Sequence, residues 1–164
     1  EKGVERALQA AAYVAGKTIP IVLHIIGDGK MMPELKRTAS LLKLQKQAVF
    51  YGEQKNPYRF MVNADLLLIT SYHEAAPLVI DEAYALGIPV LTVETTSSRE
   101  MVTERAGGWV CDNSQQGINE ALVGVLSQPE VLRKKKGDLS KMQVNNTEAY
   151  NQFKELIEES LRHE

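Results

Sequence analysis

The sequence predicts a doubly wound α/β domain built on a Rossmann-like parallel sheet. Short apolar segments rich in Val, Ile and Leu alternate with longer stretches in which apolar residues recur every three or four positions. Most apolar segments end at a glycine or a polar break, as strands do before they turn into a helix. The length of 164 residues suits one compact domain with a single core. Because strand and helix alternate, the strands should run parallel, with helices on both faces of the sheet.

The first half of the chain alternates helix and strand twice. Apolar residues at spacings of three and four predict an amphipathic helix over 2–15. The run IPIVLHII (19–26), which ends at Gly27, is typical of a buried strand. Pro33 fits the next helix only in its first turn, where its missing N–H costs nothing. The further elements expected here are a helix over 32–44, a strand over 48–51 and a short helix that ends near residue 63.

The second half continues the alternation and ends in helices. The run LLLIT (66–70) predicts a third strand, and a helix over 78–86 should stop at Gly87, which suits the C′ position. The remaining expected elements are strands over 89–93 and 109–111 and helices over 98–105, 114–127, 129–142 and 147–161. About five strands are therefore expected, followed by a helical C-terminus.

Composition narrows the class of protein. The net charge of −2 argues against a general nucleic-acid binder, which usually carries a basic excess. No apolar run approaches the roughly 20 residues that span a bilayer. Cys111 is the only cysteine, which leaves no disulfide framework and no CxxC pair and fits a cytoplasmic location. The chain opens inside an expected helix, so we take it as one domain, residues 1–164, of a longer protein.

The loops that leave the carboxyl ends of the strands should share one edge of the sheet, where ligands bind in folds of this kind. The first, Gly27-Asp28-Gly29, allows a ligand close to the backbone and leads to a helix start with free N–H groups. A tight strand-to-helix turn explains this GxG equally well.

The most informative loop carries two glutamates, Glu74 and Glu82, on either side of an expected helix start. Pro77 lies near the first helical position, and the unpaired N–H groups of Leu78 and Val79 suit a phosphate. Two acidic acceptors beside an anion site match a ligand that has hydroxyl groups on both sides of a phosphate. A nucleotide sugar has this form.

These motifs together resemble the carboxyl-terminal, donor-binding domain of glycosyltransferase family 4 (group 1), which has the two-domain GT-B fold. The resemblance runs from residue 2 to about residue 126, in the family's order and spacing, and E-x7-E is the family's signature. The stretches that carry it are IIGDG, VFYG, ADLLLITSYHEAAPLVIDEAYALGIPVL, SREMV and AGGWV.

The resemblance implies a role for each residue of the E-x7-E segment. Glu74 would contact hydroxyls of the transferred sugar and stabilise charge on it, as the catalytic residue. Glu82 would hold the ribose diol, while the amides of Leu78 and Val79 would bind the diphosphate.

The resemblance also implies further donor contacts and a reaction type. Lys2, in the family's Lys-Gly pair, would neutralise the diphosphate, and the backbone of the 52–55 loop would receive the base. The family retains the anomeric configuration and uses neither a metal nor another cofactor. The other donor-binding candidates are Gly27, Gly29, Gly52, Glu53 and His73.

Two departures from the family bear on these expectations. A strand that ends in Gly-Arg-Leu precedes the Lys-Gly pair in the family and lies in mid-sheet, but this sequence lacks it. Either the remaining strands close the gap, or another chain fills it, or the sheet is imperfect. Ala75-Ala76 stands where the family often has a glycine-containing pair, which would narrow the sugar pocket. The amino-terminal acceptor domain is also missing, so we expect no turnover from this chain alone.

Other interpretations stay open. The fold also suits a nucleotide-sugar epimerase, or a phosphorylase, whose pyridoxal phosphate would need a lysine such as Lys55. A non-catalytic receiver-like module would need more acidic residues beside Asp28. His24, inside an apolar strand, is best explained as a core histidine. The cationic run 133–136 is best explained as a solvated helix face, with a peripheral membrane contact as the lesser alternative.

Overall fold

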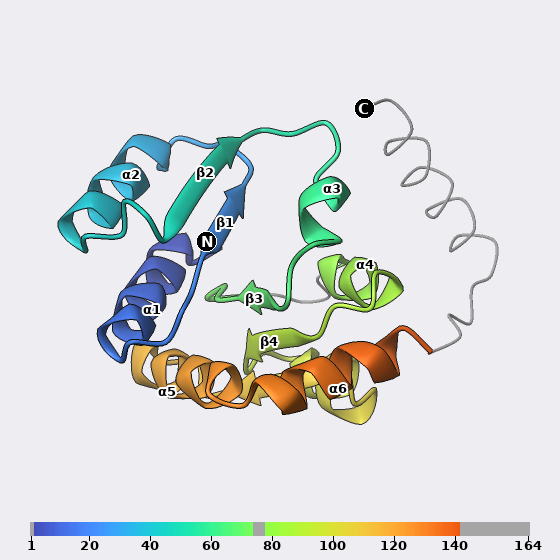
Figure 1. Ribbon diagram of the computed structural model, residues 1–164. Helices are drawn as coiled ribbons and strands as arrows, with labels where there is room; N and C mark the ends of the chain where they lie inside the picture. The colour runs from blue at the N-terminus through green and yellow to red at the C-terminus, as the bar shows by residue number, and fades with distance from the viewer. Residues whose placement is uncertain (1, 74–77, 142–164) are drawn as a thin grey trace.

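A computed structural model describes residues 2–73 and 78–141 of the chain. The helix expected over 147–161 lies outside this part. The elements are, in order, α1 (Val4–Gly16), β1 (Leu23–Ile26), α2 (Met32–Leu41), β2 (Ala48–Gly52), α3 (Tyr58–Met61), β3 (Leu67–Ile69), α4 (Val79–Ala85), β4 (Val90–Val93), η1 (Arg99–Glu104), β5 (Gly108–Cys111), α5 (Gln115–Leu126) and α6 (Pro129–Leu139) (Figure 1). Strand and helix alternate as the sequence predicts, so the α/β class is confirmed.

The strands form two separate parallel sheets. β1 pairs with β2, while β4 pairs with β3 on one edge and with β5 on the other. Within the described residues, β1 and β3 are not paired with each other. The described strands therefore do not close the expected gap, and the sheet is interrupted between β1 and β3.

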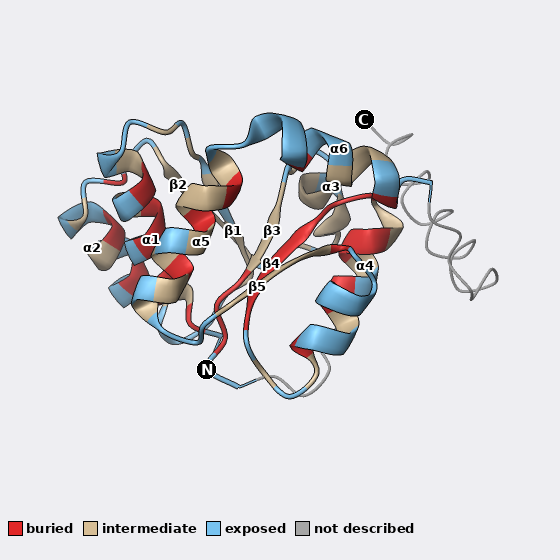
Figure 2. Ribbon diagram, turned by 90° about the horizontal axis from the view of Figure 1, so that it is seen from below, coloured by how far each residue is buried: buried red, intermediate tan, exposed pale blue. Residues whose placement is uncertain are grey.

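Helix α1 connects the two sheets through its apolar side chains. Leu8 and Ala11 pack with α2, β1 and β2, whereas Ala10 and Val14 pack with β4 and α5. These four residues are 0% exposed. A third apolar cluster joins α4, α6 and the other face of β4. Figure 2 shows β4 buried along its length, between α5 on one side and α4 on the other.

Several elements differ from their expected limits. β1 starts at Leu23 rather than at residue 19, because its pairing begins where the Leu23 N–H donates to the Gln47 carbonyl. Val22, just before the strand, is 53% exposed. The expected helix over 98–105 is a π-helical turn, η1. Gly87 follows α4 with φ of 70°, which confirms it as the C′ glycine.

Candidate functional site

The loops that follow β1 and β2 meet at the carboxyl edge of their sheet. The N–H of Gly27 donates to the carbonyl oxygen of Gly52 over 2.7 Å, just beyond an irregularity in the register at Ile26. Both glycines have positive φ, 122° and 69°, a conformation that other residues rarely adopt. The structure therefore brings together Gly27–Gly29 and Gly52–Glu53, as the sequence predicts.

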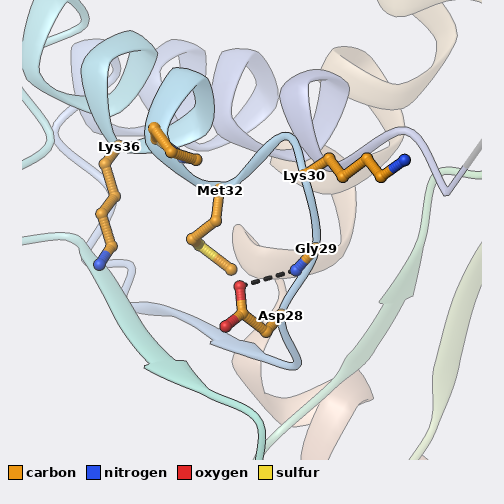
Figure 3. Close-up of a pocket in the computed structure, with 6 residues that line it drawn as sticks. Asp28, Gly29, Lys30, Met32 and Lys36 are labelled. Atoms are coloured by element: carbon orange, nitrogen blue, oxygen red, sulfur yellow. Dashed lines mark hydrogen bonds between the residues drawn. The ribbon is translucent and has the colours of Figure 1, made fainter.

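An open hollow of about 510 Å³ lies beside the first of these loops. Figure 3 shows that the Asp28 carboxylate accepts the N–H of Gly29 and that the Met32 side chain points toward it. Lys30 extends away from them in the same view. The loop is thus a tight turn closed by its own aspartate. This geometry is compatible with a ligand-binding loop and equally with a simple strand-to-helix turn. The hollow is lined by Asp28, Gly29, Lys30, Met32, Pro33 and Lys36.

The start of α1 lies against the carboxyl end of β3. The Thr70 hydroxyl donates to the carbonyl oxygen of Gly3 over 2.7 Å. Gly3 has φ of 66°, and a Cβ atom there would lie 2.1 Å from the Thr70 carbonyl oxygen, so only glycine fits. This contact places Lys2, which is exposed, beside the loop that begins at Ser71 and leads through His73 to Glu74.

Arg6 fixes this edge of the sheet, and the sequence analysis missed it. The side chain is only 5% exposed, and Nη1 donates to the Thr70 carbonyl oxygen and to Asn113 Oδ1. The guanidinium also lies over the ring of Tyr72, 4.7 Å from its centroid. Asn113 in turn donates to the Tyr72 and Glu94 carbonyls, so the ends of β3, β4 and β5 are joined. The sequence pattern does indicate that Arg6 is buried, because Arg6 lies on the same helical face as the buried residues at positions 10 and 14.

The start of α4 is open to solvent, as a donor site requires. Leu78, the residue before the helix, is 74% exposed, and Glu82 lies in its first turn. Glu74 and Pro77 fall outside the described residues, so their positions stay predictions. The Tyr58 hydroxyl donates to Glu82 Oε1 over 3.1 Å. Burial, and then the charge and hydrogen bond of Glu82, raise the pKa of Tyr58, which therefore remains a donor.

The prediction that His24 is a core histidine is wrong. His24 is exposed, its ring stacks on Tyr51 at 5.7 Å between centroids, and Nδ1 lies 2.9 Å from the Tyr51 hydroxyl. Tyr51 also contacts Phe60 of α3 at 4.4 Å between ring centroids. The apolar sequence of β1 suggested burial on both faces, whereas the helices α1 and α2 cover only one of them.

The cationic run 133–136 is largely engaged with the protein. Lys135 donates to the carbonyl of Ala106 and lies over the ring of Trp109. Lys136 donates to the carbonyl of Ala64, and Arg133 pairs with Glu130. The contacts of Lys135 and Lys136 fasten α6 to the rest of the fold, whereas the pair of Arg133 with Glu130 lies within the helix. No described helix has the length and apolar character needed to cross a bilayer.

The described residues contain no group of three or more His, Cys, Asp or Glu side chains arranged to hold a metal ion. A second hollow, of about 340 Å³, lies at the outer edge of β5 and includes Cys111. Burial raises the pKa of the Cys111 thiol to about 11. At neutral pH this cysteine is therefore a protonated, half-buried side chain and not a nucleophile.

The chain belongs to the family described as group 1 glycosyl transferases, whose profile matches residues 1–142. Lipopolysaccharide glucosyltransferase WaaG of Escherichia coli is 30% identical over 130 residues, which cover 77% of this chain and 34% of that protein. The crystal structure of WaaG has a TM-score of 0.77 and 25% identity, and covers 93% of this chain and 43% of the other. The family and the GT-B type of fold predicted from the sequence are confirmed.

Other relatives agree on the class. An uncharacterized glycosyltransferase of Methanocaldococcus jannaschii is 32% identical over 103 residues, 62% of this chain and 25% of that protein. The crystal structure of Anabaena HepE in complex with UDP-glucose has a TM-score of 0.73 at 22% identity and covers 99% of this chain and 46% of the other. The chain spans between 25% and 35% of the length of the curated relatives it matches first.

Proposed function

We propose that this chain is the donor-binding part of a retaining glycosyltransferase. The enzyme would transfer a sugar from a nucleoside diphosphate sugar to a glycan, lipid or small acceptor. The observation that carries the proposal is the exposed helix start after β3, which has Glu82 in its first turn and Lys2 at the end of the same strand. Oriented N–H groups, a cation and a carboxylate at one edge fit a diphosphate joined to a ribose.

The donor would lie along this edge from the base to the sugar. The backbone of Gly52 and Glu53, next to Gly27 and Gly29, would hold the base. Glu82 would accept hydrogen bonds from the ribose hydroxyls. HepE, which shares the fold, was crystallised with UDP-glucose, and this supports a donor of that class.

The reacting end of the donor would lie near the loop after β3. The amides of Leu78 and Val79, together with Lys2, would neutralise the diphosphate as it leaves. His73 and Glu74 would face the transferred sugar, and Glu74 would stabilise the positive charge that develops on it. We propose that the diphosphate is held without a metal ion. The acceptor would come from the other domain of the enzyme.

Substitution of the two glutamates in the full-length protein tests the proposal. We expect Glu74→Ala and Glu82→Ala to lower kcat/KM for the donor at least about a hundredfold, because each removes a charged contact. Glu120→Ala is the matched control, since this exposed glutamate of α5 hydrogen-bonds only Gln116 among the contacts described. Full activity of both variants would contradict the proposal.

Ligand binding separates the enzyme from a receiver-like module. We expect titration calorimetry to detect UDP, GDP or ADP, with the same affinity in the presence of Mg²⁺ or a chelator. Binding of Mg²⁺ alone, with no nucleotide bound, would instead favour the receiver-like module.

A further inference from the structure

We propose that Tyr58 is a positioning residue that holds the Glu82 carboxylate in the orientation that accepts the donor ribose. The inference rests on the proposed function, in which Glu82 binds the ribose. Tyr58 would not touch the donor and would act only through Glu82.

The two oxygens of the Glu82 carboxylate have different roles in this proposal. Tyr58, the first residue of α3, donates its hydroxyl proton to Oε1 of Glu82, which belongs to α4. The hydrogen bond to Oε1 restricts rotation of the carboxylate, and Oε2 would be the acceptor for a ribose hydroxyl. A free glutamate side chain must lose its rotamer freedom when a ligand binds, and a prior hydrogen bond removes part of this cost.

Tyr58 is itself held in place from both ends of its short helix. Its backbone N–H donates to Asn56 Oδ1 over 3.1 Å. The ring of Phe60, two residues later, contacts Tyr51 at the end of β2. The backbone that carries the phenol is therefore held before any ligand arrives, which a positioning role requires.

The position of Tyr58 in the chain gives this hydrogen bond a second consequence. The residue lies directly after the 52–57 loop, whose first residues would receive the base. The hydrogen bond to Glu82 thus joins the base side of the site, on the β1–β2 sheet, to the ribose side, which follows the β3–β4–β5 sheet. In the part of the chain that the structure describes, the two sheets are not paired directly, so such a link sets the distance between base and ribose contacts.

The test compares two ligands that differ only in the ribose hydroxyls. The nucleoside diphosphate that the full-length protein binds (UDP, GDP or ADP) is titrated beside its 2′,3′-dideoxy analogue. We expect Tyr58→Phe to weaken the ribose ligand about five- to tenfold, less than the full effect of a hydrogen bond to a charged group because Glu82 can still accept from the ribose, and to leave the dideoxy ligand unchanged. In turnover, KM for the donor should rise while kcat stays the same.

Tyr84→Phe is the matched control. Tyr84 lies on α4 with Glu82, but its hydroxyl donates to the Met101 carbonyl. This variant also removes one tyrosine hydroxyl, from the helix that carries Glu82, but it leaves Glu82 with its partner, so it should bind both ligands as the wild type does. A double variant, Tyr58→Phe with Glu82→Ala, should bind no more weakly than Glu82→Ala alone, because Tyr58 acts only through that carboxylate.

Two results would overturn the inference and leave the proposed function intact. The first is a Tyr58→Phe variant that retains the wild-type preference for the ribose ligand although Glu82→Ala abolishes it. The second is a Tyr58→Phe variant that binds both ligands more weakly by the same factor, which is the effect of a structural residue. If Glu82→Ala leaves the ribose preference unchanged, the proposed function itself fails and the inference fails with it.

Discussion

The two sheets show how differently similar sequences can be buried. β4 and β1 are both short apolar strands, yet all four residues of β4 are buried, while β1 has one exposed residue and three half-buried ones. β4 is paired on both edges and covered on both faces, whereas among the described residues β1 pairs with β2 alone and is covered on one face. The burial of a strand in this molecule follows from its neighbours and not from its own composition.

The proposed donor site draws on both regions. The less covered β1–β2 sheet supplies the loops assigned to the base, and the fully packed β3–β4–β5 sheet carries the elements assigned to the ribose and diphosphate. Helix α1 packs on both sheets, and Tyr58 connects the two sides of the site. Substitutions in the two sheets should therefore lower the free energy of unfolding by different amounts.

The largest effect is expected in the centre of the packed sheet. Leu91→Ala leaves a cavity where the side chain is 0% exposed, and should lower the free energy of unfolding by about 3–4 kcal/mol. Leu23→Ala in β1 should cost only about 1–2 kcal/mol, because that side chain is already half-exposed and leaves a smaller cavity. Urea unfolding of both variants measures the difference. Equal losses would mean that the two sheets are equally well packed.

Loss of Arg6 should come next in size. Arg6→Met keeps the length of the aliphatic stem but leaves the buried Thr70 carbonyl and the part-buried Asn113 amide oxygen without this donor. We expect a loss of about 2 kcal/mol in the free energy of unfolding. The control is Arg99→Met, which removes an exposed ion pair with Glu94 and should leave stability unchanged. If Arg6→Met leaves the free energy of unfolding unchanged, α1 is held to this edge by apolar packing alone.

Alkaline pH should destabilise the packed sheet through two groups. Burial raises the pKa of Cys111 from 9.0 to about 11 and that of Tyr84 from 10.0 to about 12. A raised pKa in the folded state means that the unfolded chain loses these protons first. The stabilisation is complete below pH 9 and is lost between pH 9 and 11 for Cys111, and between pH 10 and 12 for Tyr84.

Melting temperatures measured across this alkaline range test the assignment. Cys111→Ala should flatten the first part of the fall in stability, and Tyr84→Phe should flatten the second. An unchanged profile in both variants would assign the alkaline loss to other groups.

The smallest effect is expected on the exposed face of β1. His24→Ala removes the ring contact with Tyr51 and the hydrogen bond to its hydroxyl, at a cost of roughly 0.5 kcal/mol. Differential scanning calorimetry should show a small drop in melting temperature. A loss as large as that of Leu91→Ala would place His24 in a core, as the sequence alone suggested.

The sequence by itself determined the order of elements and the family, and it predicted the edge of the sheet that we propose for the site. Apolar periodicity places most of the elements, and Gly27, Gly52 and Gly87 mark turns that need positive φ. These features are local, since each depends on residues a few positions apart.

Only the tertiary structure decided which strands pair, which face of β1 is bare and which side chains support the site. Arg6 and Thr70 are 64 residues apart in the chain, and Tyr58 and Glu82 are 24 apart. Contacts of this kind depend on how whole elements pack, so no local pattern specifies them.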